Sequence, residues 1–299
     1  KLKVNFLLNM INLYKNITIT IVIYQESFEI LSKCLVNIKG FKIIIIDNSG
    51  NYKLKDELLK KHKIFKYIIN SKNLGFSKAT NQAIRLVDTT HSLCLQADCE
   101  ISIQSINKLY LALNKYDNCI MVTPTFYDAE KNLTYSGGPL PEKNIEIKIL
   151  DLEGDTCVDI ATTAAILFKK EDLINIGLFD EDFFIYYPDF EIGRRIKDYN
   201  KSIIQVFDAK AIHVMGNLKI DNIIKKTFFR NYYFTFDELI YYHKSKNKSS
   251  VYLNLKKKIF ILIYKFLFNL MVLRFVQSTK FLARVLAFYK FKNKFINKN

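Results

Sequence analysis

The chain has 299 residues, of which 49% are apolar and 25% charged, with only 9 glycines and 4 prolines; this excludes a disordered or collagen-like protein. Its net charge of +16 is typical of proteins that bind nucleic acid or an anionic membrane. All 29 acids precede residue 239, whereas the residues after Glu238 carry fourteen Lys and Arg. We therefore expect a nearly neutral body at residues 17–243, between an N-terminal extension (1–16) and a basic tail (244–299).

Runs of β-branched residues alternate with stretches of helical period along the first hundred residues. The predicted strands are Ile17–Tyr24, Phe41–Asp47, Ile64–Asn70 and Leu93–Ala97, and the helices between them are Phe28–Lys39, Leu54–His62 and Phe76–Val87. This alternation predicts βαβ units, and so an α/β fold with a Rossmann-like, mostly parallel central sheet flanked by helices. Two strands are followed by acids, Asp47 and Asp98, at the sheet edge where ligands of such folds bind.

The second half of the body predicts further strands within Asp117–Lys170, where Gly137-Gly138-Pro139 is expected to form a loop over the site. Helices are expected at Glu171–Ile176, Pro188–Tyr199 and Ile220–Tyr242. The second of these begins with proline and carries acids in its first turn, as helix N-termini favour.

Polar motifs at the strand ends each allow two interpretations. In Asp47-Asn48-Ser49, the carboxylate of Asp47 can bind a nucleobase or a ribose hydroxyl, or the motif is a turn that satisfies backbone amides. In Asn73-Leu74-Gly75-Phe76, Gly75 permits a close backbone approach before a helix, whose N-terminus favours a diphosphate. The alternative is a plain Asn cap and a turn glycine.

Three further residues are candidates for the chemistry itself. Asp98 is a candidate ligand of Mg²⁺ or Mn²⁺, which take one or two carboxylates plus phosphate oxygens, or it belongs to an acidic turn. Asp189, which flanks an aromatic stretch, is a candidate general base or a partner of the helix dipole. His213 follows a strand-like run and is either a metal or phosphate ligand or an ordinary core or surface histidine.

Taken in order, these segments resemble the inverting glycosyltransferases of family 2, most closely the branch of rhamnosyltransferases and polysaccharide-assembly enzymes. The matching elements are Ile23-Tyr24-Gln25-Glu26, Asp47-Asn48-Ser49, Asn73, Gly75, Phe76 and Asn81, Gln96-Ala97-Asp98, Gly177–Phe184, Pro188–Ile192 with Arg195, and His213. The resemblance covers residues 17–243, and the order of the elements is more specific than any one of them.

The resemblance implies a GT-A fold, an enzyme, and a role for each matching residue. Nucleotide binding would fall to Tyr24, Glu26, Asp47, Asn73, Gly75 and Asn81, metal binding to Asp98 and His213, and the acceptor side to Thr163, Asp180, Glu191 and Arg195. Asp189 would be the general base on the acceptor hydroxyl. Gln96 stands where many members have the first Asp of a DXD element, so metal binding depends mainly on Asp98.

The basic tail contains an apolar stretch, Ile259–Val276, interrupted by Lys265, Asn269 and Arg274. A charge near its centre disfavours a membrane-spanning helix. We expect a C-terminal amphipathic helical segment that lies in an anionic leaflet, attracted by the surrounding Lys and Arg side chains. The alternative is a helix pair that binds a partner or packs on the body.

The resulting functional hypothesis is a glycosyltransferase that moves a sugar such as rhamnose from a nucleotide diphosphate sugar to a glycan or polyprenyl-linked acceptor, in bacterial surface polysaccharide synthesis. Its expected place is the cytoplasm, peripheral on the inner face of the cell membrane, and five scattered cysteines fit a reducing compartment. No nucleic-acid partner is expected. The alternatives are a non-catalytic GT-A-like membrane scaffold and a nucleic-acid-binding protein that uses the basic tail.

Overall fold

The computed structural model describes residues 11–141, 149, 152–214, 220–245 and 255–297. Two compact units make up the chain: one comprises Lys1–Asp180 and Asp189–Gly216, the other Glu181–Pro188 and Asn217–Asn299. The expectations for residues 1–10 of the N-terminal extension and 246–254 of the tail lie outside the described residues.

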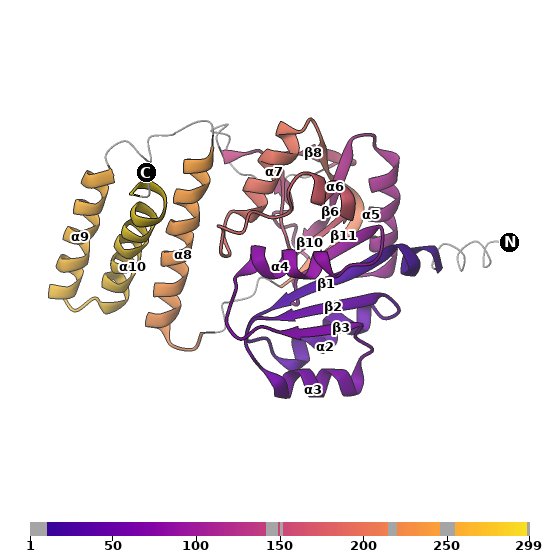
Figure 1. Ribbon diagram of the computed structural model, residues 1–299, viewed down its shortest axis with the longest axis horizontal. Coiled ribbons are helices and arrows are strands. Elements are labelled where there is room, and N and C mark those ends of the chain that lie inside the picture. Colours follow the sequence, from indigo (N-terminus) through magenta and orange to yellow (C-terminus); the bar gives the residue numbers. More distant parts are fainter. Residues whose placement is uncertain (1–10, 142–148, 150–151, 215–219, 246–254, 298–299) are drawn as a thin grey trace. The chain divides into compact units, whose positions relative to one another are not determined.

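The first unit is built on a large sheet with the strand order β3-β2-β1-β4-β10-β6-β11-β5, with β8 paired to β11 (Figure 1). The strands are β1 (Ile17–Ile23), β2 (Lys42–Asp47), β3 (Lys66–Ile69), β4 (His91–Leu95), β5 (Cys99–Ile101), β6 (Cys119–Tyr127), β8 (Thr156–Val158), β10 (Ala165–Lys169) and β11 (Ser202–His213). A separate two-stranded ladder pairs β7 (Gly137–Gly138) with β9 (Ile160–Ala161).

The predicted α/β fold is confirmed, and its parallel part is the run β3-β2-β1-β4. The rest of the sheet is mixed, because β10 enters antiparallel between β4 and β6, and β11 pairs parallel with β6 but antiparallel with β5 and β8. The expected loop at Gly137-Gly138 is instead the short strand β7.

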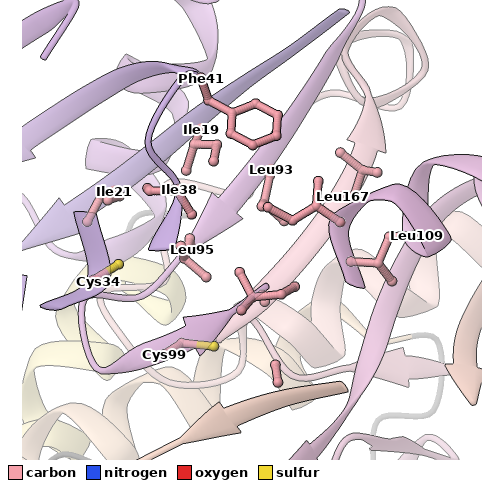
Figure 2. Close-up of a cluster of buried hydrophobic side chains, with 14 of the residues drawn as sticks. Ile19, Ile21, Cys34, Ile38, Phe41, Leu93, Leu95, Cys99, Leu109 and Leu167 are labelled. Carbon is pink, nitrogen blue, oxygen red and sulfur yellow. The ribbon is translucent and has the colours of Figure 1, made fainter. Parts of the chain in front are cut away.

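Helices cover both faces of the sheet. They are α2 (Phe28–Asn37), α3 (Tyr52–Lys61), α4 (Phe76–Arg85), α5 (Ile103–Lys115), α6 (Lys170–Asn175) and α7 (Pro188–Asp198). Strand β2 explains the two-sided packing: Ile43 and Ile45 belong to the core cluster under α2, α3 and α5, whereas the alternating Ile44 and Ile46 pack with α4. Figure 2 shows the first cluster, in which Ile21 of β1 lies near Cys34 of α2 and Ile19 lies near Ile38 and Phe41.

Full burial of such side chains stabilises the fold by about 1.5–3 kcal/mol each. The described end of the N-terminal extension belongs to this core, since Leu13 is buried and the ring of Tyr14 packs edge-on against Phe41. The carboxyl ends of β1, β2 and β4 are thereby fixed at one edge of a rigid sheet.

The second unit consists of α8 (Ile223–Lys244), α9 (Leu255–Met271), α10 (Phe275–Phe291) and a short π-helix, η2 (Lys292–Ile296). Helix α10 packs against both α8 and α9 (Figure 1). The apolar stretch predicted as one helix is broken after Met271, where Leu273 adopts a positive φ of 55° and α10 begins. In the structure α8 groups with the tail helices, whereas the body predicted from sequence extends to residue 243.

Candidate functional site

Asp98 and His213 are brought together by strand pairing. Asp98 lies directly before β5 and His213 ends β11, and the antiparallel register places His213 opposite Cys99. The backbone N–H of Val214 donates to the carbonyl oxygen of Asp98 at 3.1 Å. The Nε2 of His213 lies 3.5 Å from Oδ1 of Asp98, and both side chains remain partly accessible.

This pair fits a divalent cation that also binds a diphosphate. Mg²⁺ and Mn²⁺ usually take one or two protein ligands and fill the remaining positions with phosphate oxygens and water. Within the described part of the chain no group of three or more His, Cys, Asp or Glu side chains gathers to enclose an ion. The neighbouring Glu100 pairs instead with Lys33, at 2.6 Å. An open two-residue site for a metal shared with substrate is therefore the arrangement that these residues allow.

Asp189 stands in the first turn of α7, directly after Pro188. Burial raises the pKa of Asp189 from its ordinary value to about 6, although a hydrogen bond from the backbone N–H of Phe190 to Oδ1, at 3.1 Å, opposes the rise. A carboxylate with such a pKa is largely ionised at neutral pH and accepts a proton more readily than an ordinary aspartate. The role of Asp189 as a general base stays a prediction.

The motif at the end of β2 is tightly bonded within the protein. Asp47 is fully buried: Oδ1 accepts from the N–H of Ser49 at 2.7 Å and from its hydroxyl, and Oδ2 accepts from the hydroxyl of Tyr67 at 3.0 Å. Both carboxylate oxygens thus have a protein partner. These contacts are those of a residue that shapes the turn, the second interpretation of this motif; binding of a nucleobase stays a prediction.

Two of the predicted nucleotide-binding motifs meet at Gly75. The side chain of Asn48 donates to the carbonyl oxygen of Gly75 at 3.2 Å, and the N–H of Gly75 donates to the side chain of Asn73 at 2.9 Å. Gly75 has a φ of 80° and caps α4, a conformation that glycine adopts at little cost. The ends of β2 and of the loop before α4 are thereby tied together.

The remaining predicted nucleotide residues divide into two groups. Tyr24 and Glu26 directly follow β1, at the same edge of the sheet as Asp47. Asn81, in contrast, is buried, and its side chain both donates to the carbonyl oxygen and accepts from the N–H of Phe179, at 2.8 and 3.0 Å. Asn81 therefore holds the backbone next to Asp180.

On the predicted acceptor side, Glu191 and Arg195 form a bidentate ion pair, with N–O distances of 2.6 and 2.7 Å. The guanidinium of Arg195 also donates to the carbonyl oxygens of Ile176 and Leu178. The pair thus holds the turn in which Leu178 has a positive φ of 60°. Glu191 and Arg195 act on the backbone of this turn, and their contact with an acceptor stays a prediction.

Thr163 lies in the turn between β9 and β10, which two backbone hydrogen bonds anchor. The N–H of Thr162 donates to Ser136 at 2.9 Å, and the N–H of Gln96 donates to Ala164 at 2.8 Å. This turn therefore lies beside the strand end that leads to Asp98.

Tyr135 is a residue that the sequence analysis did not select. It lies next to Ser136, just before the two glycines of β7, and nothing else in the sequence marks it as a site residue. In the structure, burial and the charge of Asp189 raise the pKa of Tyr135.

Comparisons with known proteins place the chain among glycosyltransferases. The sequence model of the family "Glycosyl transferase family 2" matches residues 18–175 of the chain. The chain is 26% identical over 260 residues to the dTDP-rhamnosyl transferase RfbF of Shigella flexneri, covering 83% of this chain and 86% of RfbF. It is 27% identical over 205 residues to the low-salt glycan biosynthesis hexosyltransferase Agl10 of Haloferax volcanii, covering 64% of this chain and 66% of Agl10.

A solved structure of GalNAc-T7 with UDP, GalNAc and Mn²⁺ superposes with a TM-score of 0.56 at 15% identity, and covers 76% of this chain. The chain spans about half of that protein, 51% of its length, so this likeness concerns the fold alone. The family match extends over more than half of the chain and includes the ends of β1, β2 and β4 and Asp98, whereas Asp189 and His213 lie beyond it. The chain is therefore a glycosyltransferase of family 2 with a GT-A-like fold.

Proposed function

We propose that this enzyme transfers a sugar, with rhamnose as the first candidate, from a nucleotide diphosphate sugar to a hydroxyl of a glycan or polyprenyl-linked acceptor, with inversion at the anomeric carbon. The observation that carries the proposal is the pair Asp98–His213 at the strand ends, together with a carboxylate of raised pKa, Asp189. The similarity to RfbF supports dTDP-rhamnose as the donor. Surface polysaccharide assembly is the corresponding process.

The chemistry divides between two sets of residues. Asp98 and His213 would hold Mg²⁺ or Mn²⁺, and the bound ion would neutralise the charge that develops on the diphosphate leaving group. Asp189 accepts the proton of the attacking hydroxyl, so that a strong nucleophile forms only beside the donor. The backbone around Gly75, at the N-terminus of α4, favours a negatively charged group.

The proposal predicts that dTDP-rhamnose stabilises the protein in the presence of Mn²⁺. At a ligand concentration of one hundred times Kd the expected gain is about 2.7 kcal/mol, visible as a higher Tm. Asp98→Asn removes the metal-dependent part of this shift, because the amide is a poorer ligand. The exposed Asp56 of α3 provides a matched control, Asp56→Asn, that leaves the shift unchanged.

A set of other nucleotide sugars in the same assay identifies the donor if dTDP-rhamnose is not preferred. Stabilisation by no nucleotide sugar, with or without Mn²⁺, contradicts the proposed function. Stabilisation without transfer to any acceptor favours the non-catalytic scaffold instead.

We further propose that α9 attaches the enzyme to an anionic membrane surface at the cytoplasmic face. No helix of the described residues has the length and hydropathy needed to span a bilayer. The outward face of α9 is apolar and consists of Phe260, Ile261, Tyr264, Leu267, Phe268 and Met271, which recur at helical spacing and are all exposed. Phe260 and Met271 are 72% and 76% exposed. The apolar face of α9 thus has no partner within the described residues.

Two uncharged polar residues of this helical pair are buried instead. Asn269, 9% exposed, donates to the carbonyl oxygen of Lys265, and the buried Ser278 of α10 donates to that of Phe266. An ordinary surface helix buries its apolar face and exposes its polar face, whereas α9 exposes apolar side chains and buries Asn269. Exposed Lys256 and Lys257 flank it, and each basic residue near an anionic leaflet contributes about 1 kcal/mol.

Replacing Phe260 and Met271 together by serine should weaken binding to phosphatidylglycerol vesicles at least tenfold (about 1.4 kcal/mol), without lowering Tm. Vesicle co-sedimentation measures the first effect and thermal unfolding the second. Val36→Ser serves as the control, since Val36 is also well exposed, at 63%, but lies on α2. Binding to duplex DNA but not to vesicles would favour the nucleic-acid alternative, and dimers that the double substitution separates would identify a second copy as the partner.

A further inference from the structure

The hydroxyl of Tyr135 is an unpaired polar group in the interior of the first unit. Its oxygen is shielded from solvent and has no hydrogen-bond partner among the described residues. Buried polar groups are nearly always satisfied, because an unpaired hydroxyl forfeits the hydrogen bonds it makes with water. A bound ligand that hydrogen-bonds this hydroxyl would explain why no protein group does so.

The ring of Tyr135 lies across a glycine of β7. A Cβ atom at Gly138 would approach the Tyr135 hydroxyl oxygen to 3.1 Å. The preceding Gly137 is equally confined, since a Cβ there would come within 2.7 Å of the carbonyl oxygen of Ile160. The two glycines therefore let β7 pair closely with β9 and let the phenol occupy its position.

Strand β9 also connects this region to α7, which carries Asp189. Helix α7 packs directly against the chain before β9, because a Cβ at Gly193 would lie 2.3 Å from the carbonyl oxygen of Asp159. Lys197, one turn further along α7, pairs with the carboxylate of Asp159 at 2.7 Å. The helix of the proposed base and the strand beside Tyr135 are thus fixed to the same short ladder.

The charge of Asp189 also acts on the phenol of Tyr135. After burial, the charge of Asp189 is the second cause that raises the pKa of Tyr135. The phenol therefore stays protonated across the working pH range and is available as a hydrogen-bond donor.

We propose that Tyr135 is an acceptor-binding residue, whose hydroxyl hydrogen-bonds a hydroxyl of the acceptor sugar adjacent to the one that Asp189 deprotonates. This inference rests on the proposed function and adds to it a second polar contact for the acceptor. The ligand class is a sugar with neighbouring hydroxyl groups, because one hydroxyl must meet the carboxylate and another the phenol.

Tyr135→Phe tests the proposal, because it keeps the ring against Gly138 and removes only the unpaired oxygen. With dTDP-rhamnose as donor and a panel of octyl hexosides as acceptors, we expect KM for the best acceptor to rise about 3- to 10-fold, the range of one neutral hydrogen bond. The Tm of the variant should equal or exceed that of the wild type, and its stabilisation by the donor should not change.

Tyr116→Phe is the matched control, since the hydroxyl of Tyr116 donates to Asp155 at 2.9 Å. This control should leave KM unchanged and should not raise Tm. An unchanged KM in Tyr135→Phe, with transfer that still requires Asp189, overturns the inference but not the proposed function. A lower Tm in Tyr135→Phe also overturns it, because the phenol then has a partner in the free protein. A wild-type enzyme that uses no acceptor of the panel counts against both.

Discussion

Replacing Asp189 by asparagine is expected to lower the rate of sugar transfer by about 10²–10⁴-fold, the usual contribution of a general base. The substitution is nearly isosteric, and the amide oxygen can still accept the N–H of Phe190, which now donates to Oδ1. The first turn of α7 should therefore keep its geometry. Stabilisation by nucleotide sugar and Mn²⁺ should persist, because Asp98 and His213 are unchanged.

The pH dependence of the same reaction gives an independent measurement. A base must be ionised to act, and the pKa of Asp189 is about 6, so the rate should fall about tenfold per pH unit below pH 6. The stability effect has the opposite sign. Because the raised pKa makes the folded protein bind the proton more tightly than the unfolded chain, the free energy of unfolding should fall as pH rises from about 4 to 6.

Asp189→Asn should lack this decline and should therefore be more stable than the wild type at pH 7. Stopped assays across pH 5–8 and urea unfolding at pH 4 and 7 measure the two effects. Asp56→Asn is again the control. Transfer at the wild-type rate by Asp189→Asn would remove the assignment of the base.

The second large effect is expected at Asp237 of α8. Its carboxylate is fully buried and accepts the backbone N–H groups of Phe184, Ile185 and Tyr186, at 2.8–3.2 Å. Replacement by alanine leaves these three donors without their partner, and hydrogen bonds to charged groups each contribute about 1.5–3 kcal/mol. We expect Asp237→Ala to destabilise the second unit by about 3–5 kcal/mol.

Hydrogen exchange distinguishes this loss from general unfolding, since the amides of residues 184–186 should lose protection first. Asp237→Asn should cost much less, because its amide oxygen can still accept the N–H groups of Ile185 and Tyr186. Equal protection of these amides in Asp237→Ala and wild type would contradict the prediction.

Asp237 also titrates near neutrality. Burial raises its pKa to about 7, against the lowering effects of the three N–H groups and of Lys294. The folded unit therefore binds this proton more tightly than the unfolded chain does, and its stability should decline between about pH 4 and 7. Asp237→Asn should remove that decline.

The strands and their order along the chain could be predicted because hydrophobic periodicity and strand-end acids are local signals. Ile43–Ile46 alternate between the two faces of the sheet, as a buried parallel strand requires. The insertion of β10 between β4 and β6 could not be predicted, since no local pattern records which strand will become its neighbour. The family resemblance assigns both Asp98 and His213 to the metal, but the register of β5 and β11 that unites them has no local signal in the sequence.

The sequence indicates which polar residues are of interest, but it does not show which groups they hydrogen-bond. The sequence marks Asn81 and Arg195 as residues of interest, but only the folded chain shows that they bind the backbone at Phe179 and at Leu178. Tyr135 and Asp237 are ordinary residues in the sequence. The hydroxyl of Tyr135 stands out because it has no partner among the described residues, and the carboxylate of Asp237 because it accepts three backbone N–H groups. Both environments are formed by segments that are distant along the chain.

The interruption of the first unit between Asp180 and Asp189 has a consequence for the modularity of this enzyme. Glu181–Pro188 belongs with the C-terminal helices. The chain therefore enters the second unit at Glu181, returns to the first unit at Asp189, and enters the second unit again at Asn217. A protein ended at Gly216 would retain the peptide next to Asp189 but lose Asp237, which binds it. The first unit and the C-terminal helices are therefore interleaved along the sequence, so that a truncation after Gly216 does not separate one whole unit from the other.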